Sequence, residues 1–429
     1  MIKITENKTI LIKDAKILNG SINKGSILIE NDKIKEVNPN ISVTDADKVI
    51  NAENKIVLPG LINTHSHLAM TLLRGVGDDL KLDTWLNDHI WPREAKLTDE
   101  LCYIGSKLAI AEMIKTGTTC YNDMYFHMDQ TAKATKETGI RGLISYGMID
   151  LFDEEKKKKE LNISKKLIED YHNSSDGRLQ VALGPHSPYT CSQELLEETV
   201  KLANKYNIKT HIHVAETQKE VDDLKKERNQ TPFEYLNEIG ILGENTIAAH
   251  GVWATDNDIQ IIKKTKTSIS HNPSSNMKLA SGIAPIKEYL ENGINVCIGT
   301  DGCASNNNLD MFKEMKLTTL LQKVHNYNPE VLTAQETLNM ATINGAKALG
   351  INAGRIDENY KADLILVDNN TINMTPDNNS LSNIIYASIA TNTDSVICNG
   401  EILLENKELT TINEKELMED TEVIAKELQ

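Results

Sequence analysis

The sequence has no apolar run of about 18 residues, the length that a helix needs to cross a membrane. Its first eight residues, Met-Ile-Lys-Ile-Thr-Glu-Asn-Lys, lack the apolar core of a secretory signal peptide. It also lacks an excess of basic charge, because 46 Lys and Arg stand against 62 Asp and Glu, for a net charge of −16. We therefore expect neither a membrane nor nucleic acid as a partner.

The six cysteines are scattered, and no two of them form a Cys-x-x-Cys pair. We therefore expect reduced cysteines that serve packing, in a cytoplasmic protein. The chain has no internal sequence repeat and no low-complexity segment apart from the charge run 153–160, which we assign to a solvated face. With 40% hydrophobic and 25% charged residues, its 429 residues are typical of a globular protein with one large domain and a smaller one.

Apolar runs alternate with amphipathic stretches through the middle of the chain. We predict helices at 98–116, 128–138, 156–172, 192–206, 231–239, 256–264 and 284–292, then at 309–324 and 333–349. We predict strands at the run that ends in His67 and at 118–123, 141–149, 179–186, 209–216, 246–252, 267–272 and 295–301. Eight buried parallel strands joined by helices predict an α/β fold of the (β/α)₈ or TIM-barrel type.

Short strands precede and follow this region. The turns Glu30-Asn31-Asp32-Lys33 and Asn399-Gly400 are typical of β-hairpins. We predict three segments. Residues 1–57 would form the N-terminal part of a small β-sandwich domain, residues 58–350 the metal-dependent barrel, and residues 351–429 the C-terminal part of the small domain with an acidic tail helix.

Polar residues gather where the predicted strands end. Seven of the eleven histidines lie there, namely His65, His67, His186, His211, His213, His250 and His271. Asn122, Asp123, Glu216 and Asp301 also lie at strand ends. The C-terminal ends of barrel strands form one rim, which carries the chemistry of such folds. We therefore predict one polar site at this rim.

His65 and His67 are two residues apart, so in a strand they point to the same side. Three imidazoles and a carboxylate, with an open position for water, suit Zn²⁺ or Fe²⁺ as a hydrolytic centre. His213 and Asp301 would complete that set. His211 shares a strand face with His213, and the period of two does not choose between them.

A metal in such a site lowers the pKa of its water to roughly 7. Asp301 could then take the proton from that water, and Glu216 could act as an acid or base on the substrate. His250 could hold the attacking hydroxide and help to move protons. The catalytic candidates are therefore Glu216, His250 and Asp301.

These motifs in this order resemble the amidohydrolase superfamily over nearly the whole chain, including the split β domain. They are Pro-Gly-Leu-Ile-Asn-Thr-His-Ser-His at 59–67, His-Ile-His-Val-Ala-Glu at 211–216, His-Gly at 250–251 and Thr-Asp-Gly at 300–302. Within it, 5′-methylthioadenosine/S-adenosylhomocysteine deaminases are the most similar group. They are indicated by Leu-Arg-Gly at 73–75, Trp-Pro-Arg-Glu at 91–94, Gly-Pro-His at 184–186 and Ser-His-Asn-Pro at 270–273.

The resemblance implies one divalent metal per subunit, Zn²⁺ with Fe²⁺ or Mn²⁺ as alternatives, held by His65, His67, His213 and Asp301. It implies that Glu94 accepts hydrogen bonds from the ribose hydroxyls and that His186 contacts the nucleoside. Glu216 would protonate adenine N1 as metal-activated water attacks C6, His250 and Asp301 would handle the water proton, and ammonia would leave. The implied substrates are methylthioadenosine and S-adenosylhomocysteine, with 5′-deoxyadenosine and adenosine as further candidates.

The chain departs from its relatives at two positions. Tyr146 stands where some members carry an arginine near the end of strand three, so the way in which the 5′ substituent is held stays open. His186 stands where binuclear members have a metal-bridging lysine, which implies one metal and not two.

Three other functions share parts of this pattern. Guanine and other aminopurine deaminases and triazine-type chlorohydrolases have the same metal set, with another leaving group and ring pocket. A non-catalytic relative used in assembly should have lost ligands, and none is missing here. The sequence does not decide whether the chain forms a homo-oligomer, which metal it holds in the cell, or which 5′ group it prefers.

Overall fold

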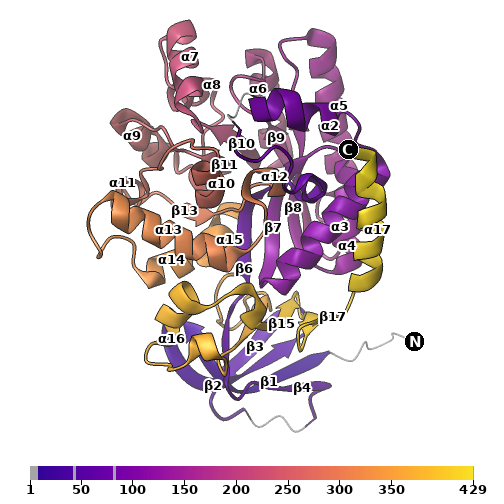
Figure 1. The fold of residues 1–429 in the computed structure, drawn as a ribbon, viewed down its shortest axis with the longest axis vertical. Coiled ribbons are helices and arrows are strands. Elements are labelled where there is room, and N and C mark those ends of the chain that lie inside the picture. The colour runs from indigo at the N-terminus through magenta and orange to yellow at the C-terminus, as the bar shows by residue number, and fades with distance from the viewer. Residues whose placement is uncertain (1–7, 42–44, 81–83, 429) are drawn as a thin grey trace.

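The computed structural model describes residues 8–41, 45–80 and 84–428. Residues 1–7, on which the expectation of no signal peptide depends, lie outside the described residues. Two β-sheets organise the chain, one of eight and one of nine strands. Helices surround the eight-stranded sheet, and the nine-stranded sheet lies below it in Figure 1.

The eight-stranded sheet carries the predicted alternation of strands and helices. Each strand pairs in parallel with its neighbours in chain order. All eight predicted strands are present, as β6 (Leu61–Ser66), β7 (Thr118–Tyr125), β8 (Arg141–Met148), β9 (Leu179–Pro185), β10 (Thr210–Val214), β11 (Thr246–His250), β12 (Ser268–His271) and β13 (Val296–Ile298). The prediction of a TIM-like fold is confirmed.

The first and last strands of this sheet meet and bring the two ends of the site together. The hydroxyl of Thr64 donates to the carbonyl of Ile298 at 2.9 Å. The amide of Asp301 donates to the carbonyl of His65, also at 2.9 Å. These contacts place Asp301 beside the histidine pair although 236 residues (301 − 65) separate them in sequence.

Helices connect the strands and continue after the last one. They are α2 (Trp91–Glu94), α3 (Asp99–Lys115), α4 (Met128–Thr138), α5 (Glu154–Tyr171), α6 (Gln193–Tyr206), α7 (Gln218–Arg228), α8 (Pro232–Ile239), α9 (Asp256–Thr265), α10 (Pro273–Lys278), α11 (Ile286–Glu291), α12 (Cys303–Asn306), α13 (Met311–His325), α14 (Ala334–Met340) and α15 (Ile343–Leu349). The single helix predicted at 333–349 is two helices, because Thr342 leaves the helical conformation (φ −131°, ψ −95°). The sequence did not predict α7, because Val221 and Leu224 are its only buried apolar residues and its apolar period is therefore sparse.

The nine-stranded sheet is built from both ends of the chain. It contains β1 (Thr9–Asn19), β2 (Ser21–Glu30), β3 (Lys33–Asn38), β4 (Lys48–Asn51), β5 (Lys55–Pro59), β14 (Leu364–Asp368), β15 (Thr393–Cys398), β16 (Glu401–Glu405) and β17 (Glu408–Leu409). Antiparallel pairing of β5 with β14 joins the two terminal segments. The predicted small β unit is therefore present, as one continuous hydrogen-bonded sheet where a sandwich has two. The domain limits at residues 57 and 350 stay predictions.

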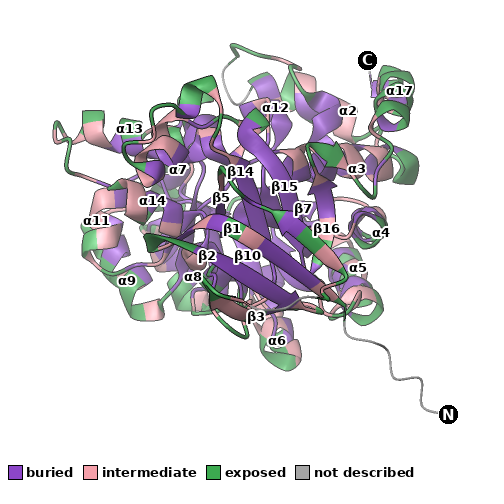
Figure 2. Cartoon of the chain, turned by 90° about the horizontal axis from the view of Figure 1, so that it is seen from below, coloured by how far each residue is buried: buried purple, intermediate pink, exposed green. Residues whose placement is uncertain are grey.

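A buried ion pair links the two sheets, and the C-terminal helix packs on the barrel. Nε of Arg141, on β8, donates to Oδ2 of Asp363 at 2.8 Å, with both side chains buried. The tail helix α17 (Glu414–Ile424) packs on α3, where Lys115 pairs with Glu414 at 2.5 Å. Figure 2 shows most strand residues as buried, apart from parts of the nine-stranded sheet, and the outer faces of the helices as exposed.

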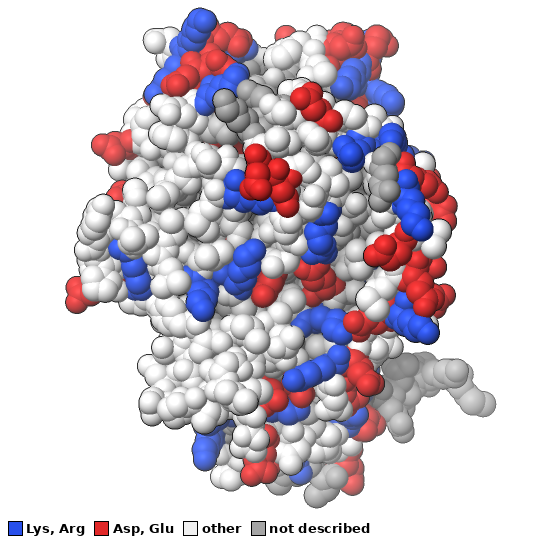
Figure 3. Space-filling model, viewed as in Figure 1, with Lys and Arg blue, Asp and Glu red and all other residues white. Residues whose placement is uncertain are grey.

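Cysteines and surface charge fit the expectations from composition. All six cysteines are buried and unpaired. On the face seen in Figure 3, basic side chains lie beside acidic ones and form no continuous basic area. Within the described parts of the chain, no helix has the length and apolar character of a membrane span.

Candidate active site

One pocket opens at the C-terminal ends of the barrel strands. It measures about 930 Å³ with its open mouth included, which suits a small molecule. Seven of the eight predicted site residues line it, namely His67, Glu94, His186, His213, Glu216, His250 and Asp301. The eighth, His65, is fully buried directly beneath it and faces Asp301.

Hydrogen bonds to backbone carbonyls fix the orientation of two of the predicted ligand imidazoles. Nδ1 of His67 lies 2.5 Å from the carbonyl of Met124, and Nδ1 of His213 lies 2.7 Å from that of His186. A carbonyl only accepts, so each Nδ1 carries a proton, and each Nε2 has a lone pair when the ring is neutral. Both Nε2 atoms are therefore available to a metal ion.

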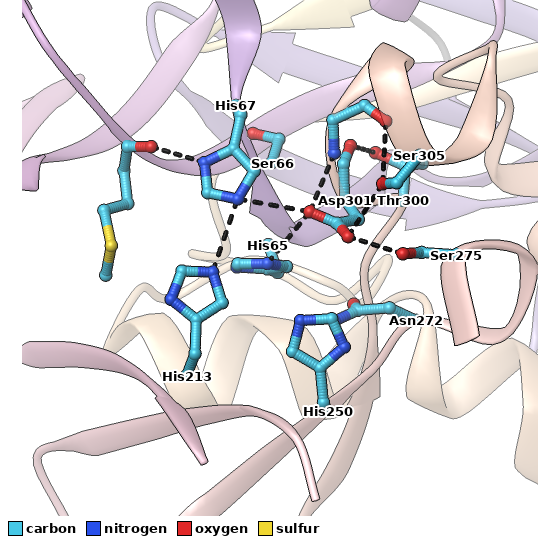
Figure 4. Close-up of polar contacts among 12 residues, drawn as sticks. His65, Ser66, His67, His213, His250, Asn272, Ser275, Thr300, Asp301 and Ser305 are labelled. Carbon is cyan, nitrogen blue, oxygen red and sulfur yellow. Dashed lines mark hydrogen bonds and ion pairs between the residues drawn. The ribbon is translucent and has the colours of Figure 1, made fainter. Parts of the chain in front are cut away.

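The ligand atoms converge on one point. Oδ1 of Asp301 lies 3.2 Å from Nε2 of His65 and 3.2 Å from Nε2 of His67. Nε2 of His67 lies 3.3 Å from Nε2 of His213. Figure 4 shows His65 and His67 turned toward the Asp301 carboxylate, and His213 turned toward His67. Two nitrogen ligands of a tetrahedral ion with bonds of about 2.0–2.1 Å lie about 3.3–3.4 Å apart, so the cluster fits a divalent metal.

A network of hydroxyl and amide donors holds the Asp301 carboxylate. The hydroxyls of Ser275 and Ser305 donate to its Oδ2 at 2.6 and 2.9 Å, and the amide of Gly302 donates to its Oδ1 at 2.8 Å. The sequence analysis missed both serines, which are within four residues of predicted strand-end residues. Asp301 itself adopts a left-handed backbone conformation (φ 62°), a costly geometry for a non-glycine residue that is often found at functional sites.

The electrostatics of the cluster favour a cation. Burial lowers the pKa of His65 to about 4, which keeps this imidazole neutral at physiological pH. Burial also opposes charge on Asp301, but its contacts with His65 and His67 hold its pKa well below the usual range. For His67, the contact with Asp301 outweighs burial and raises the pKa to about 9, so a metal that binds Nε2 must displace a proton from this ring. A carboxylate that stays ionised among buried imidazoles is suited to bind a positive ion.

Glu216 and His250 face each other across the pocket. Nε2 of His250 lies 3.9 Å from Oε2 of Glu216. The other ring nitrogen, Nδ1, lies 2.9 Å from Oδ1 of Asn276, so it is the protonated one and Nε2 is free to accept a proton. Burial raises the pKa of Glu216, which favours the protonated acid.

The structure separates His211 from His213, which the sequence did not. The ring of His211 lies behind His65, with its Nε2 2.8 Å from Nδ1 of His65. It therefore contacts a ligand imidazole and is not itself in the converging set. By accepting the Nδ1 proton of His65, His211 would keep Nε2 of His65 directed at the metal.

Replacing His211 should therefore weaken metal binding. We expect the metal dissociation constant of His211→Ala to rise about 10- to 100-fold above that of the wild type. The dissociation constant of His211→Gln should lie between those of the wild type and His211→Ala, because glutamine can still accept the proton of His65. Competition with a chelator measures this. His271→Ala is the matched control, since His271 is also buried at a strand end but lies outside the converging set. An unchanged dissociation constant in His211→Ala would contradict the role.

Away from the converging ligands, the pocket lining is largely apolar, and Glu94 and His186 are two further polar residues in it. The hydroxyl of Tyr125 donates to Oε1 of Glu94 at 2.7 Å, and burial raises the pKa of Glu94. Nδ1 of His186 lies 2.9 Å from the hydroxyl of Thr190, which leaves Nε2 for a ligand. The apolar wall consists of Trp85, Leu86, Ile90, Trp91, Phe126 and Ile149. The sequence analysis missed Tyr125 and most of this wall, which comes from the π-helical turn Trp85–Ile90 and from several strand ends.

Besides His65 and His211, four polar residues singled out at the strand ends lie outside the pocket lining. Oδ1 of Asp123 accepts from the amide of Leu68 at 2.8 Å and so supports the segment after His67. The side chain of Asn122 donates to the carbonyl of Thr64 at 2.8 Å. His271 is fully buried. Tyr146 lines a neighbouring pocket, where its hydroxyl lies 3.4 Å from Oε1 of Glu160.

Comparison with known proteins agrees with this geometry. Residues 56–403 match the sequence model of the amidohydrolase family. This chain belongs to that family. A 5′-deoxyadenosine deaminase of Methanosphaera stadtmanae is 62% identical over 99% of this chain and 100% of its own length. One from Methanobrevibacter smithii is 53% identical over 99% of both chains.

Two solved structures share the fold of this chain. An adenosine deaminase from Xanthomonas campestris, solved with bound zinc, has a TM-score of 0.93 and 32% identity over 98% of both chains. An atrazine chlorohydrolase from Arthrobacter aurescens has a TM-score of 0.92 but only 24% identity, over 97% of this chain and 100% of that one, and shows the fold alone. The chain is thus a hydrolase that acts on carbon–nitrogen bonds, and its histidine cluster fits the divalent metal of the family.

Proposed function

We propose that this enzyme hydrolyses the 6-amino group of adenine nucleosides, with 5′-deoxyadenosine as the preferred substrate and 5′-methylthioadenosine as a second one. One observation carries the proposal. His67, His213, Asp301 and Glu216 line the same pocket as Glu94, so the converging ligands, the acid and a second carboxylate face one cavity. The relatives named as 5′-deoxyadenosine deaminases support the choice of substrate.

The proposed metal ligands are His65, His67, His213 and Asp301, and the proposed metal is zinc, as in the related adenosine deaminase structure. When bound there, the metal supplies a nucleophilic water of lowered pKa at neutral pH. Three nitrogen donors and one carboxylate oxygen suit Zn²⁺, and Fe²⁺ or Mn²⁺ would also accept this set.

The protein residues then handle the protons. Glu216 donates a proton to N1 of the adenine ring, which needs one as C6 becomes tetrahedral. Asp301 accepts the proton of the attacking water, and Nε2 of His250 is placed to accept or return it. Asp301 or His250 then returns the water proton to the 6-amino group, the C6–N bond breaks, and ammonia leaves. The C6 hydroxyl gives its proton to the Glu216 carboxylate, which yields the 6-oxo product and restores the acid.

Glu94 recognises the ribose through its hydroxyl groups. Its second carboxylate oxygen is free to accept from the 2′ and 3′ hydroxyls, since Oε1 already accepts from Tyr125. We expect Glu94→Gln to raise KM about 10- to 100-fold, the worth of hydrogen bonds to a charged group, with metal content unchanged. Steady-state kinetics on 5′-deoxyadenosine and on its 2′,3′-dideoxy analogue test this. The KM of the variant for the dideoxy analogue should differ little from that of the wild type. An equal rise in KM for both substrates would show that Glu94 is misassigned.

The surroundings of the 5′ position favour apolar substituents. The described residues that line the pocket include no Lys or Arg, and Trp85, Ile90 and Phe126 contribute large apolar surfaces. A methyl or methylthio group can be buried there, whereas the amino-acid tail of S-adenosylhomocysteine would need charged partners. We therefore place S-adenosylhomocysteine below the two smaller nucleosides as a substrate.

A substrate panel tests the proposal. We expect ammonia release from 5′-deoxyadenosine and methylthioadenosine with the highest kcat/KM, slower release from adenosine and S-adenosylhomocysteine, and no turnover of guanine or a chlorotriazine. Turnover of a free base without any nucleoside would refute it. We also propose a cytoplasmic location, which the six unpaired cysteines support.

A further inference from the structure

Glu220 is a buried carboxylate that the proposed mechanism does not use. Its side chain accepts two backbone amides, that of Ala215 at Oε1 and that of Glu216 at Oε2, both at 2.9 Å. Only 8% of the residue is exposed, and burial raises its pKa to about 7. Burying an acid is costly unless its oxygens are hydrogen-bonded, so both contacts are needed to keep it there.

The two amides belong to an unusual turn directly after β10. Ala215 has a left-handed backbone (φ 51°) although it is not glycine. In such a turn, successive N–H groups point to one side and form a concave anion site. The carbonyl of Ala215 is fixed as well, because it accepts from the amides of Val252 and Trp253 at 3.0 Å. The turn that presents Glu216 is therefore held from two sides.

Comparison with other helix starts of this chain shows that the contact is not ordinary capping. At α8 and α14 the sequence Thr-x-x-Glu makes a reciprocal cap, in which Glu234 and Glu336 accept from the amides of Thr231 and Thr333. Helix α7 starts with the same pattern, Thr217 to Glu220, and Thr217 accepts from the amide of Glu220. The Glu220 carboxylate, however, does not accept from the amide of Thr217. It accepts from the amides of Ala215 and Glu216, the two residues before Thr217.

We propose that Glu220 is a positioning residue for the acid: its carboxylate fills the backbone turn at Ala215 and so aims Glu216 at the substrate. This inference rests on the proposed role of Glu216. Of these two glutamates only Glu216 contacts substrate, so Glu220 acts through the backbone. A glutamine at 220 can accept one amide but sets its own N–H₂ against the other.

The test compares Glu220→Gln with Glu216→Gln and with Glu336→Gln, a matched loss of a capping carboxylate on α14. We expect Glu220→Gln to lower kcat about 100-fold, as for a catalytic group misplaced by about 1 Å, with KM and metal content unchanged. Glu336→Gln should keep the wild-type kcat. Glu220→Ala should recover kcat in formate, which can reach this position through the surface pocket that Glu220 lines, and should not recover in chloride.

The outcomes separate this inference from the proposed function. A wild-type kcat in Glu220→Gln, together with an inactive Glu216→Gln, overturns the positioning role and leaves the proposed function standing. An equal loss of kcat in Glu220→Gln and Glu336→Gln also overturns it, because the loss of any capping carboxylate would then be enough to lower kcat. A fully active Glu216→Gln instead refutes the proposed acid.

Discussion

Asp301→Asn should lower kcat/KM for 5′-deoxyadenosine by at least about 10⁴-fold. The change removes a proton acceptor, whose loss alone costs about 10²–10⁴, and it alters a metal ligand. The asparagine would also direct either an uncharged oxygen or an N–H₂ group at the nitrogens that now face Oδ1, those of His65 and His67. Kinetics and metal analysis of the purified variant measure both effects.

The control for this variant is Asp310→Asn. Asp310 caps α13 by accepting from the amides of Phe312 and Lys313, and asparagine is an equally good cap. Asp310→Asn should therefore keep wild-type activity and metal content. If Asp301→Asn retained more than a tenth of the activity, the assignment of Asp301 as proton acceptor would be wrong.

Glu216→Gln should lower kcat by about 10²–10⁴-fold, the usual contribution of a positioned general acid. Glutamine has nearly the same shape but no acidic proton to give to the ring nitrogen. Metal content should stay at the wild-type value, because Glu216 lies outside the converging ligand set. The expected pattern is thus a loss in kcat with a fully loaded site, measured by kinetics and metal analysis.

Glu234→Gln is a suitable control for Glu216→Gln, since Glu234 caps α8, accepts from the side chain of Asn257 and lies outside the pocket lining. It should leave kcat unchanged and cost at most about 2 kcal/mol of stability, which thermal unfolding reports. A loss of metal in Glu216→Gln that matches its loss of activity would contradict the acid role. It would instead place Glu216 among the ligands.

The local sequence determined much of the fold, because strand and helix periods depend on neighbouring residues. Eight apolar runs alternating with helices predicted the TIM-like sheet, and all eight strands are present. Helix α7 was missed because its apolar residues are few. The break at Thr342 was missed because nothing in the apolar period marks it.

Part of the site could likewise be predicted from the sequence, and part could not. The period of two put His65 and His67 on one strand face, and strand-end positions brought Glu216 and Asp301 into the same rim. Only the tertiary structure separated His211 from His213. How far along a strand face each residue reaches depends on strand tilt and on register with the neighbouring strands. As a result, the ring of His213 contacts His67, whereas the ring of His211 lies behind His65.

The sequence by itself thus determined the barrel, the strand ends and the types of residue that could hold a metal and move protons. The tertiary structure decided which ring nitrogens are free, how close the ligand atoms lie, and that Tyr125 holds Glu94 while Glu220 holds the turn before Glu216. The physical reason is that periodicity is a property of neighbouring residues, whereas distances of about 3 Å between side chains depend on how distant segments pack.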